Sequence, residues 1–167
     1  LLLSGGATLG LFHLGVIKAL WSEGLLPTVL SGSSAGSIVA AIAATHSDDE
    51  LTRIFDPGYV NLEAWRDFGL NNLFEGPGFG NIDKLSRAIN RNVKKWTFEE
   101  TFVRSGRVVN VSISPSDPNQ FPRLLSFHNA PNVFVRRAVL AACAIPGLFP
   151  AVQLWGRNFS GRTVPSM

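Results

Sequence analysis

At residues 32–36 the chain reads Gly32-Ser33-Ser34-Ala35-Gly36, which is a Gly-x-Ser-x-Gly pattern. The stretch follows a short apolar run and precedes the small and apolar residues 37–44, which predict a helix. Such a pattern between a strand and a helix is typical of a nucleophile elbow, a turn so tight that the middle serine projects outward. We therefore expect Ser34 to be a nucleophile, with Gly32 and Gly36 forming the elbow.

A second glycine-rich turn lies upstream of the elbow. The apolar residues 1–4 predict a buried parallel strand, and Gly5-Gly6-Ala7-Thr8-Leu9-Gly10 follows it, before a helix expected from about Leu9 to Glu23. Strand, turn and helix in this repeated order predict an α/β fold with a parallel sheet, in which both turns open at one edge. Backbone N–H groups at that edge could hold an oxyanion. The residues assigned to this oxyanion hole are Gly5, Gly6, Ala7, Gly10 and Ala35.

Other local patterns predict the remaining elements. Capping boxes at Ser47 and Thr97, each with glutamate three residues later, predict two helix starts. The helix at about 9–23 is apolar on nearly every side, so we expect it to be buried. The further expected helices lie at about 47–55, 81–93, 97–104 and 133–144, and the further strands at about 28–31, 107–114 and 151–154.

Two neighbouring segments leave alternatives open. Residues 59–80 are rich in aromatic side chains and form either an irregular connection that packs on itself or a flap near Ser34. The helix at 81–93 is followed by further lysines and carries a basic face, which is either an ordinary solvated face or a contact with anionic lipid. The residues of that face are Lys84, Arg87, Arg91 and Lys94.

Composition narrows the class of protein. Hydrophobic residues make up 46% of the 167 residues and charged residues 16%, which fits one domain with a buried interior or a lipid-facing surface. The formal net charge of +3 is too small to indicate nucleic-acid binding. No apolar run is long enough to span a bilayer, so any membrane contact is expected to be peripheral. The single cysteine, Cys143, lies in an alanine-rich run and is expected in the core.

A general base for Ser34 is hard to find. A serine hydroxyl needs one to become a good nucleophile. His13 lies in an expected buried helix, His46 lies at the far end of the elbow helix, and His128 follows a polar loop. No aspartate stands out as a base, and no cluster has the spacing of metal ligands, so we predict neither a metal nor another cofactor. A nucleotide-binding unit is disfavoured, because the first turn lacks Gly-x-Gly-x-x-Gly spacing and no Gly-Lys-Ser/Thr loop occurs.

Four stretches together resemble the patatin-like phospholipase family. They are the glycine turn at 4–10, Gly-Val-Ile-Lys-Ala-Leu at 15–20, the elbow at 32–36, and the alanine-rich run ending in Pro-x-x-Phe-Pro at 141–150. Their order and spacing extend over almost the whole chain. Ala7 and Leu9 stand where the family usually has glycine and a basic residue, which is similar to its triacylglycerol-lipase branch.

The resemblance implies a Ser-Asp dyad without histidine. Ser34 matches the nucleophile, whereas the family's aspartate stands in an Asp-Gly motif after Pro-x-x-Phe-Pro. No aspartate here precedes glycine, and none follows Asp117. We therefore expect a single patatin-like three-layer domain over 1–167 that is incomplete at both ends, with the catalytic aspartate beyond Met167. On this interpretation the chain alone has little or no activity.

The leading hypothesis is a serine lipid acyl hydrolase. It would cleave glycerolipid esters, of triacylglycerol or phospholipid, through an acyl-enzyme on Ser34. Two alternatives remain: a lipid acyltransferase on the same site, and a non-catalytic lipid-binding module. An intracellular location at a peripheral membrane or a lipid droplet is expected, and no nucleic-acid partner.

Overall fold

The sheet of this protein is mostly parallel, as expected. The computed structural model describes residues 1–62, 82–117, 119–146 and 149–166. Its main sheet has the strand order β1-β2-β3-β4. Strands β1 (Leu2–Leu3), β2 (Val29–Ser33) and β3 (Val108–Ile113) are parallel, and β4 (Arg123–Leu125) pairs antiparallel with β3. The predicted α/β fold is confirmed, although β4 was not expected.

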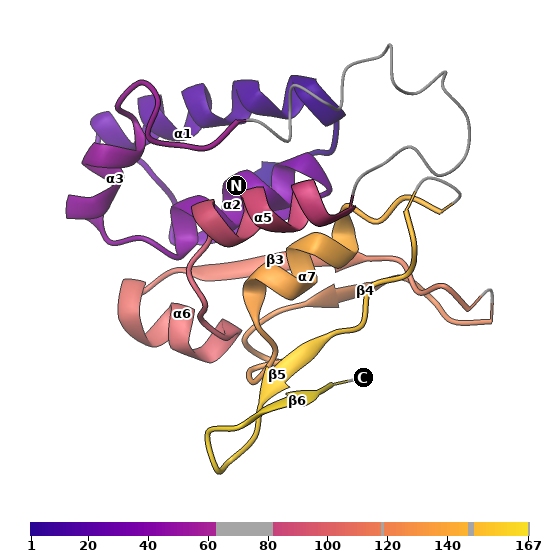
Figure 1. Cartoon of the computed structure of the whole chain (residues 1–167). Coiled ribbons are helices and arrows are strands. Elements are labelled where there is room, and N and C mark those ends of the chain that lie inside the picture. Colours follow the sequence, from indigo (N-terminus) through magenta and orange to yellow (C-terminus); the bar gives the residue numbers. More distant parts are fainter. Residues whose placement is uncertain (63–81, 118, 147–148, 167) are drawn as a thin grey trace.

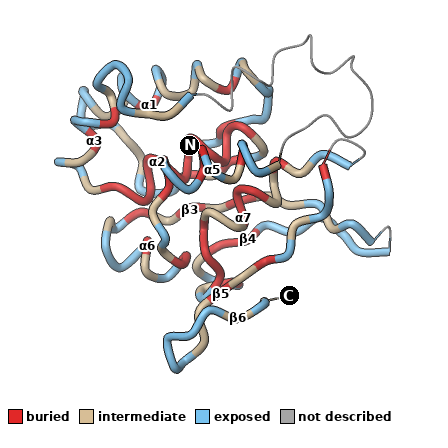
Figure 2. Tube along the Cα trace, in the orientation of Figure 1, coloured by how far each residue is buried: buried red, intermediate tan, exposed pale blue. Residues whose placement is uncertain are grey.

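Helix α2 (Ala35–Ala44) is the centre of the molecule. All ten of its residues are buried, and it packs against all three parallel strands. It also packs against helices α1 (Phe12–Ser22), α6 (Phe98–Ser105) and α7 (Val135–Ala142). In Figure 1, α1 lies on one side of α2 and the strands lie on the other. In Figure 2 the parts of α2 that are visible behind α5 (Ile82–Asn92) are red, the colour of buried residues. Alanines at half of its positions, together with Gly36 and Ser37, let the neighbouring elements approach this closely.

The other helices begin where the local patterns predict. Short helix η1 (Ala7–Leu11) leads into α1 (Phe12–Ser22), and α3 (Asp48–Ile54) starts after the Ser47 capping box. Helix α6 (Phe98–Ser105) starts after the Thr97 capping box and ends at Gly106, whose φ of 70° lies in the left-handed region that glycine favours. The described residues also form helices α5 (Ile82–Asn92) and α7 (Val135–Ala142).

Two expectations about these elements were wrong. Helix α1 is not buried: only Ile17 is fully covered, while Phe12 is 73% exposed. The reason is that α1 packs on the outside of α2, so one face of it has no covering layer among the described residues. The last strand does not cover 151–154 but is β5 (Trp155–Arg157), which forms a hairpin with β6 (Thr163–Pro165). The side-chain oxygen of Asn158 accepts hydrogen bonds from the amides of Ser160 and Arg162 in the turn between the two strands. The partner strand β6 therefore lies opposite 155–157, and pairing with it begins at Trp155.

No helix among the described residues is both long and apolar enough to cross a membrane.

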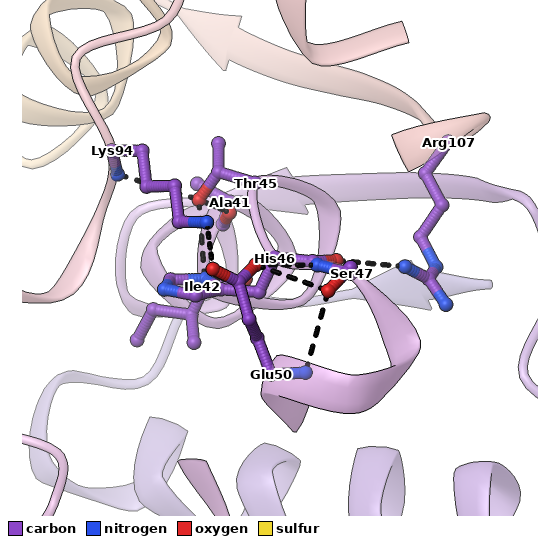
Figure 3. A network of polar contacts seen from close by, with 8 residues as sticks. All are labelled: Ala41, Ile42, Thr45, His46, Ser47, Glu50, Lys94 and Arg107. Carbon is purple, nitrogen blue, oxygen red and sulfur yellow. Dashed lines mark hydrogen bonds and ion pairs between the residues drawn. The ribbon is translucent and has the colours of Figure 1, made fainter. Parts of the chain in front are cut away.

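A polar network closes the carboxyl end of α2 (Figure 3). The Thr45 hydroxyl donates to the Ala41 carbonyl at 2.7 Å, and His46 Nδ1 donates to the Ile42 carbonyl at 2.8 Å. Arg107 Nη1 donates to the His46 carbonyl at 2.9 Å, and Lys94 forms an ion pair with Glu50. Two cations thus lie where the helix dipole is negative, which stabilises α2 from its far end.

The burial of His46 and the ion pair of Glu50 make the contribution of this network to stability depend on pH. Desolvation lowers the pKa of His46 below its ordinary 6.5, and the nearby Lys94 lowers it further, although the bond to Ile42 and the charge of Glu50 oppose this. The Lys94 ammonium holds the pKa of Glu50 at about 2. In the unfolded chain both groups take up a proton at higher pH than in the folded protein. Stability should therefore fall below pH 6.5 because of His46, and fall again between 4.5 and about 2 because of Glu50.

The substitution His46→Asn tests the decrease in stability below pH 6.5. It keeps a hydrogen-bond donor near the Ile42 carbonyl and removes the titrating ring. We expect the urea midpoint of the native protein to decrease between pH 7 and pH 5, and the variant to show a clearly smaller decrease. Glu50→Gln serves as a matched control in which the pH 5 to 7 decrease should persist. An equal decrease in native protein and His46→Asn would contradict the assignment.

Candidate active site at the start of helix α2

Ser34 occupies a strained backbone position between β2 and α2. Its φ is 48° and its ψ is −125°, a region in which residues other than glycine are rare and which costs about 1–3 kcal/mol. The Ser34 carbonyl accepts hydrogen bonds from the Ser37 amide at 2.9 Å and the Ser37 hydroxyl at 2.6 Å. The residue is half-buried and acts as the N-cap of α2 without a side-chain capping bond. This conformation is the sharp strand-to-helix turn that the sequence predicts.

The elbow glycines are required by close backbone approaches. A Cβ atom on Gly36 would lie 2.2 Å from the Leu3 carbonyl oxygen, and one on Gly32 would lie 2.4 Å from Cα of Ser37. Both distances are far below any normal contact. The end of β1 therefore crosses directly against the first turn of α2, with room for backbone alone.

The glycine turn after β1 lies beside Ser34. Because β1 and β2 are parallel and pair Leu3 with Gly32, both turns leave the sheet at the same edge. A Cβ on Gly5 would lie 3.3 Å from Cβ of Ser34 and 4.0 Å from its Oγ, and one on Gly10 would lie 2.4 Å from Cβ of Ala35.

The starts of two helices meet at this edge. Gly6, with φ of 154°, is the N-cap of η1, and Ala7 follows with φ of 48°. Neither η1 nor α2 has a side-chain cap at its start. The first-turn N–H groups of a helix carry partial positive charge and bind anions well. The structure thus places Gly5 against Ser34 and Gly10 against Ala35, and Gly6 and Ala7 belong to the same turn as Gly5.

The histidines do not join this site. His13 Nε2 donates to the Ser4 carbonyl at 2.9 Å, which ties α1 to the end of β1. His46 lies at the opposite end of α2, about 15 Å along the helix axis. His128 follows β4, which runs antiparallel to β3 and therefore leads to the opposite edge of the sheet. Among the described residues, no group of His, Cys, Asp and Glu could hold a metal ion.

Cys143 is a neighbour of Ser34 that the sequence does not reveal. It is 5% exposed and belongs to the main core cluster, as expected of a small core residue. Burial raises the pKa of its thiol to about 12, and hydrogen bonding with the Ser34 and Ser37 side chains offsets only part of the rise. The thiol is therefore protonated at neutral pH and is no rival nucleophile. A contact between residues so far apart in the chain leaves no local pattern.

The close approach at Gly36 gives a direct test. In Gly36→Ala the added methyl group must push β1 away from α2, and we expect a loss of at least ~2 kcal/mol of unfolding free energy. The matched control is Gly15→Ala on α1, where a Cβ meets nothing within 4 Å and the change should stabilise by about 0.5–1 kcal/mol. Urea denaturation measures both. Equal effects of the two substitutions would show that the elbow is not packed as described.

Comparison with known proteins identifies the family of this chain. The family model described as patatin-like phospholipase matches residues 1–162. The chain is 32% identical over 170 residues to triacylglycerol lipase ptl2 of Schizosaccharomyces pombe, covering 99% of this chain and 27% of that protein. It is 34% identical over 170 residues to triacylglycerol lipase SDP1L of Arabidopsis thaliana, covering 99% and 21%. The chain thus spans about a quarter of the length of these relatives.

A solved structure shares the fold. The crystal structure of VipD from Legionella pneumophila matches with a TM-score of 0.53 and 14% sequence identity, covering 99% of this chain and 47% of that one. At this identity the likeness concerns the fold alone. The family model, by contrast, includes both turns that surround Ser34, and the chain belongs to the patatin-like phospholipase family.

Proposed function

We propose that the protein is a serine lipid acyl hydrolase in which Ser34 attacks the ester carbonyl of a glycerolipid. The observation that carries this proposal is the strained Ser34, held at the start of a fully buried helix with the glycine turn against it. Strained residues of this kind concentrate at functional sites. The names of the relatives, which are triacylglycerol lipases, support a glycerolipid substrate.

The proposed reaction uses the Ser34 hydroxyl and the backbone N–H groups at the starts of η1 and α2. Ser34 Oγ forms a bond to the carbonyl carbon while its proton passes to a general base, and the carbonyl oxygen becomes an oxyanion. The N–H groups of Gly6, Ala7 and Ala35 would stabilise that charge, with Gly5 and Gly10 keeping the backbone close. The intermediate then collapses, the alcohol leaves with the proton, and water cleaves the acyl-enzyme by the same steps.

The general base of the proposed dyad is an aspartate. Asp48 binds Arg107 at the far end of α2, and Asp67 lies outside the described residues. No Asp-Gly pair occurs in the 167 residues. The proposal therefore assigns this role to none of the described aspartates, and activity is best measured on the full-length protein.

Labelling with a fluorophosphonate tests the nucleophile. We expect the full-length protein to be labelled covalently, and Ser34→Ala to lose at least 100-fold in labelling rate. Ser33→Ala is the matched control, because Ser33 is exposed and adjacent but belongs to β2, and it should keep labelling within a few-fold. Labelling that persists in Ser34→Ala would refute the proposal.

Two alternatives use the same fold. A lipid acyltransferase would pass the acyl group to an acceptor lipid instead of water, so products measured with and without an acceptor distinguish it. A non-catalytic lipid-binding module would bind lipid but would not be labelled by the fluorophosphonate. The strain at Ser34 favours catalysis, because a binding module has no use for a projecting hydroxyl.

A peripheral lipid surface is the second part of the proposal. Helix α5 buries Leu85, Ala88 and Ile89 and exposes Lys84, Arg87 and Arg91 on its outer side. Lys94 belongs to the network at the end of α2, so we exclude it from this basic face. The segment 59–80, for which an irregular connection and a flap were both left open, lies mostly outside the described residues, and Tyr59 and Leu62 are exposed.

Neutralising the basic face should weaken binding to anionic vesicles. At about 1 kcal/mol for each basic residue near an anionic surface, changing Lys84, Arg87 and Arg91 to glutamine should weaken binding to phosphatidylserine vesicles on the order of 100-fold in co-sedimentation. A control with the same loss of charge changes the exposed Lys18, Arg53 and Arg162. If both triple variants bind alike, α5 is not the contact surface.

A further inference from the structure

A cavity of about 590 Å³ opens at the carboxyl end of β3. Its walls come from the end of β3 and the residues after it, from the end of α7, and from residues 149–154. The size falls in the range of small-molecule sites in proteins.

The sheet register places this cavity beside Ser34. Ser33, the last residue of β2, is paired with Ser112 of β3, so Ser34 and Ile113 each come directly after this pair. Adjacent strands lie about 5 Å apart. Ile113 lines the cavity, which therefore lies at the end of the strand that pairs with β2, the strand that leads into Ser34.

Helix α7 gives a second, independent connection. Ala141 and Ala144 line the cavity, and Cys143 between them lies near enough to the Ser34 and Ser37 side chains for both to influence the pKa of its thiol. Helices α2 and α7 also pack together. Residues 141–144 thus lie beside Ser34 and also form part of the cavity wall.

The lining separates into an apolar interior and a polar opening. Among its apolar members, Leu154 and Phe149 are buried, and Ile113, Ala141, Ala144 and Val152 are half-buried. The polar members are all exposed, as are the apolar Pro146 and Ala151; the polar members are Ser114, Ser116, Asp117, Gln120, Arg123 and Gln153. A ligand with a long apolar part and a polar end matches this division.

We propose that this cavity holds the acyl chain of the substrate while the ester carbonyl lies at Ser34. The assignment rests on the proposed function and adds to it the place where the fatty chain binds. Burial of the chain against the alanines and Val152 supplies the binding free energy, because removing methylene groups from water is favourable. The small side chains of Ala141 and Ala144 leave the space that the chain fills.

Filling the cavity should change selectivity without removing reactivity. We would substitute three positions from two walls, Ala141→Leu, Ala144→Leu and Val152→Phe, in the full-length protein. The measurement is the rate of labelling of Ser34 by a hexadecyl fluorophosphonate relative to an ethyl one. We expect each folded variant to lose at least tenfold in this ratio, with ethyl labelling within about threefold of the native rate. The matched control is Ala19→Leu, the same substitution on the exposed side of α1, and it should leave the ratio unchanged.

A binding measurement separates failure of the cavity from failure of the proposed function. The fluorescent fatty acid cis-parinaric acid is titrated into Ser34→Ala protein, which needs no catalysis. Binding that weakens at least tenfold on adding Ala141→Leu or Val152→Phe supports the cavity even if the native protein is not labelled. An unchanged labelling ratio in the folded variants, or parinaric acid binding that is indifferent to both substitutions, overturns the proposal.

Discussion

The complete burial of α2 is the constraint on which the rest of the structure depends. A serine at φ 48° is unfavourable by itself, and a free turn would relax. Here the helix that begins at the next residue is packed on every side, and its far end is held by Thr45, His46 and Arg107. Neither end of α2 can move without disrupting the core. The stability of the whole molecule is thus what maintains the strain at Ser34.

Parallel pairing of β1 and β2 explains why two helix starts meet at one place. Each strand runs into a tight turn at the same sheet edge, and glycines at 5, 10, 32 and 36 let these turns touch through backbone atoms. The amides that would stabilise an oxyanion are therefore fixed before any substrate arrives. Such preorganised donors contribute most to acyl transfer when they need not rearrange during the reaction.

The sequence allowed correct prediction of those features that are encoded locally. The elbow, the glycine turn and the capping boxes at Ser47 and Thr97 each occupy a few consecutive residues, and all lie where they were expected. Features that need a distant partner were not predictable. The open face of α1 depends on its lying outside α2, the start of β5 depends on β6, and the neighbour of Ser34 at Cys143 comes from more than a hundred residues away.

Contact between β1 and α2 through backbone atoms alone has a consequence for how such a protein can evolve. The contact between β1 and α2 depends on glycine and main-chain atoms, so it does not directly involve the side chains that line the neighbouring cavity. The walls of the neighbouring cavity, in contrast, are side chains at 113, 141, 144 and 152. Substitutions there could adapt the protein to new lipids while the chemistry is inherited unchanged. If the proposed function holds, reactivity and selectivity depend on separate parts of the chain and can diverge at different rates.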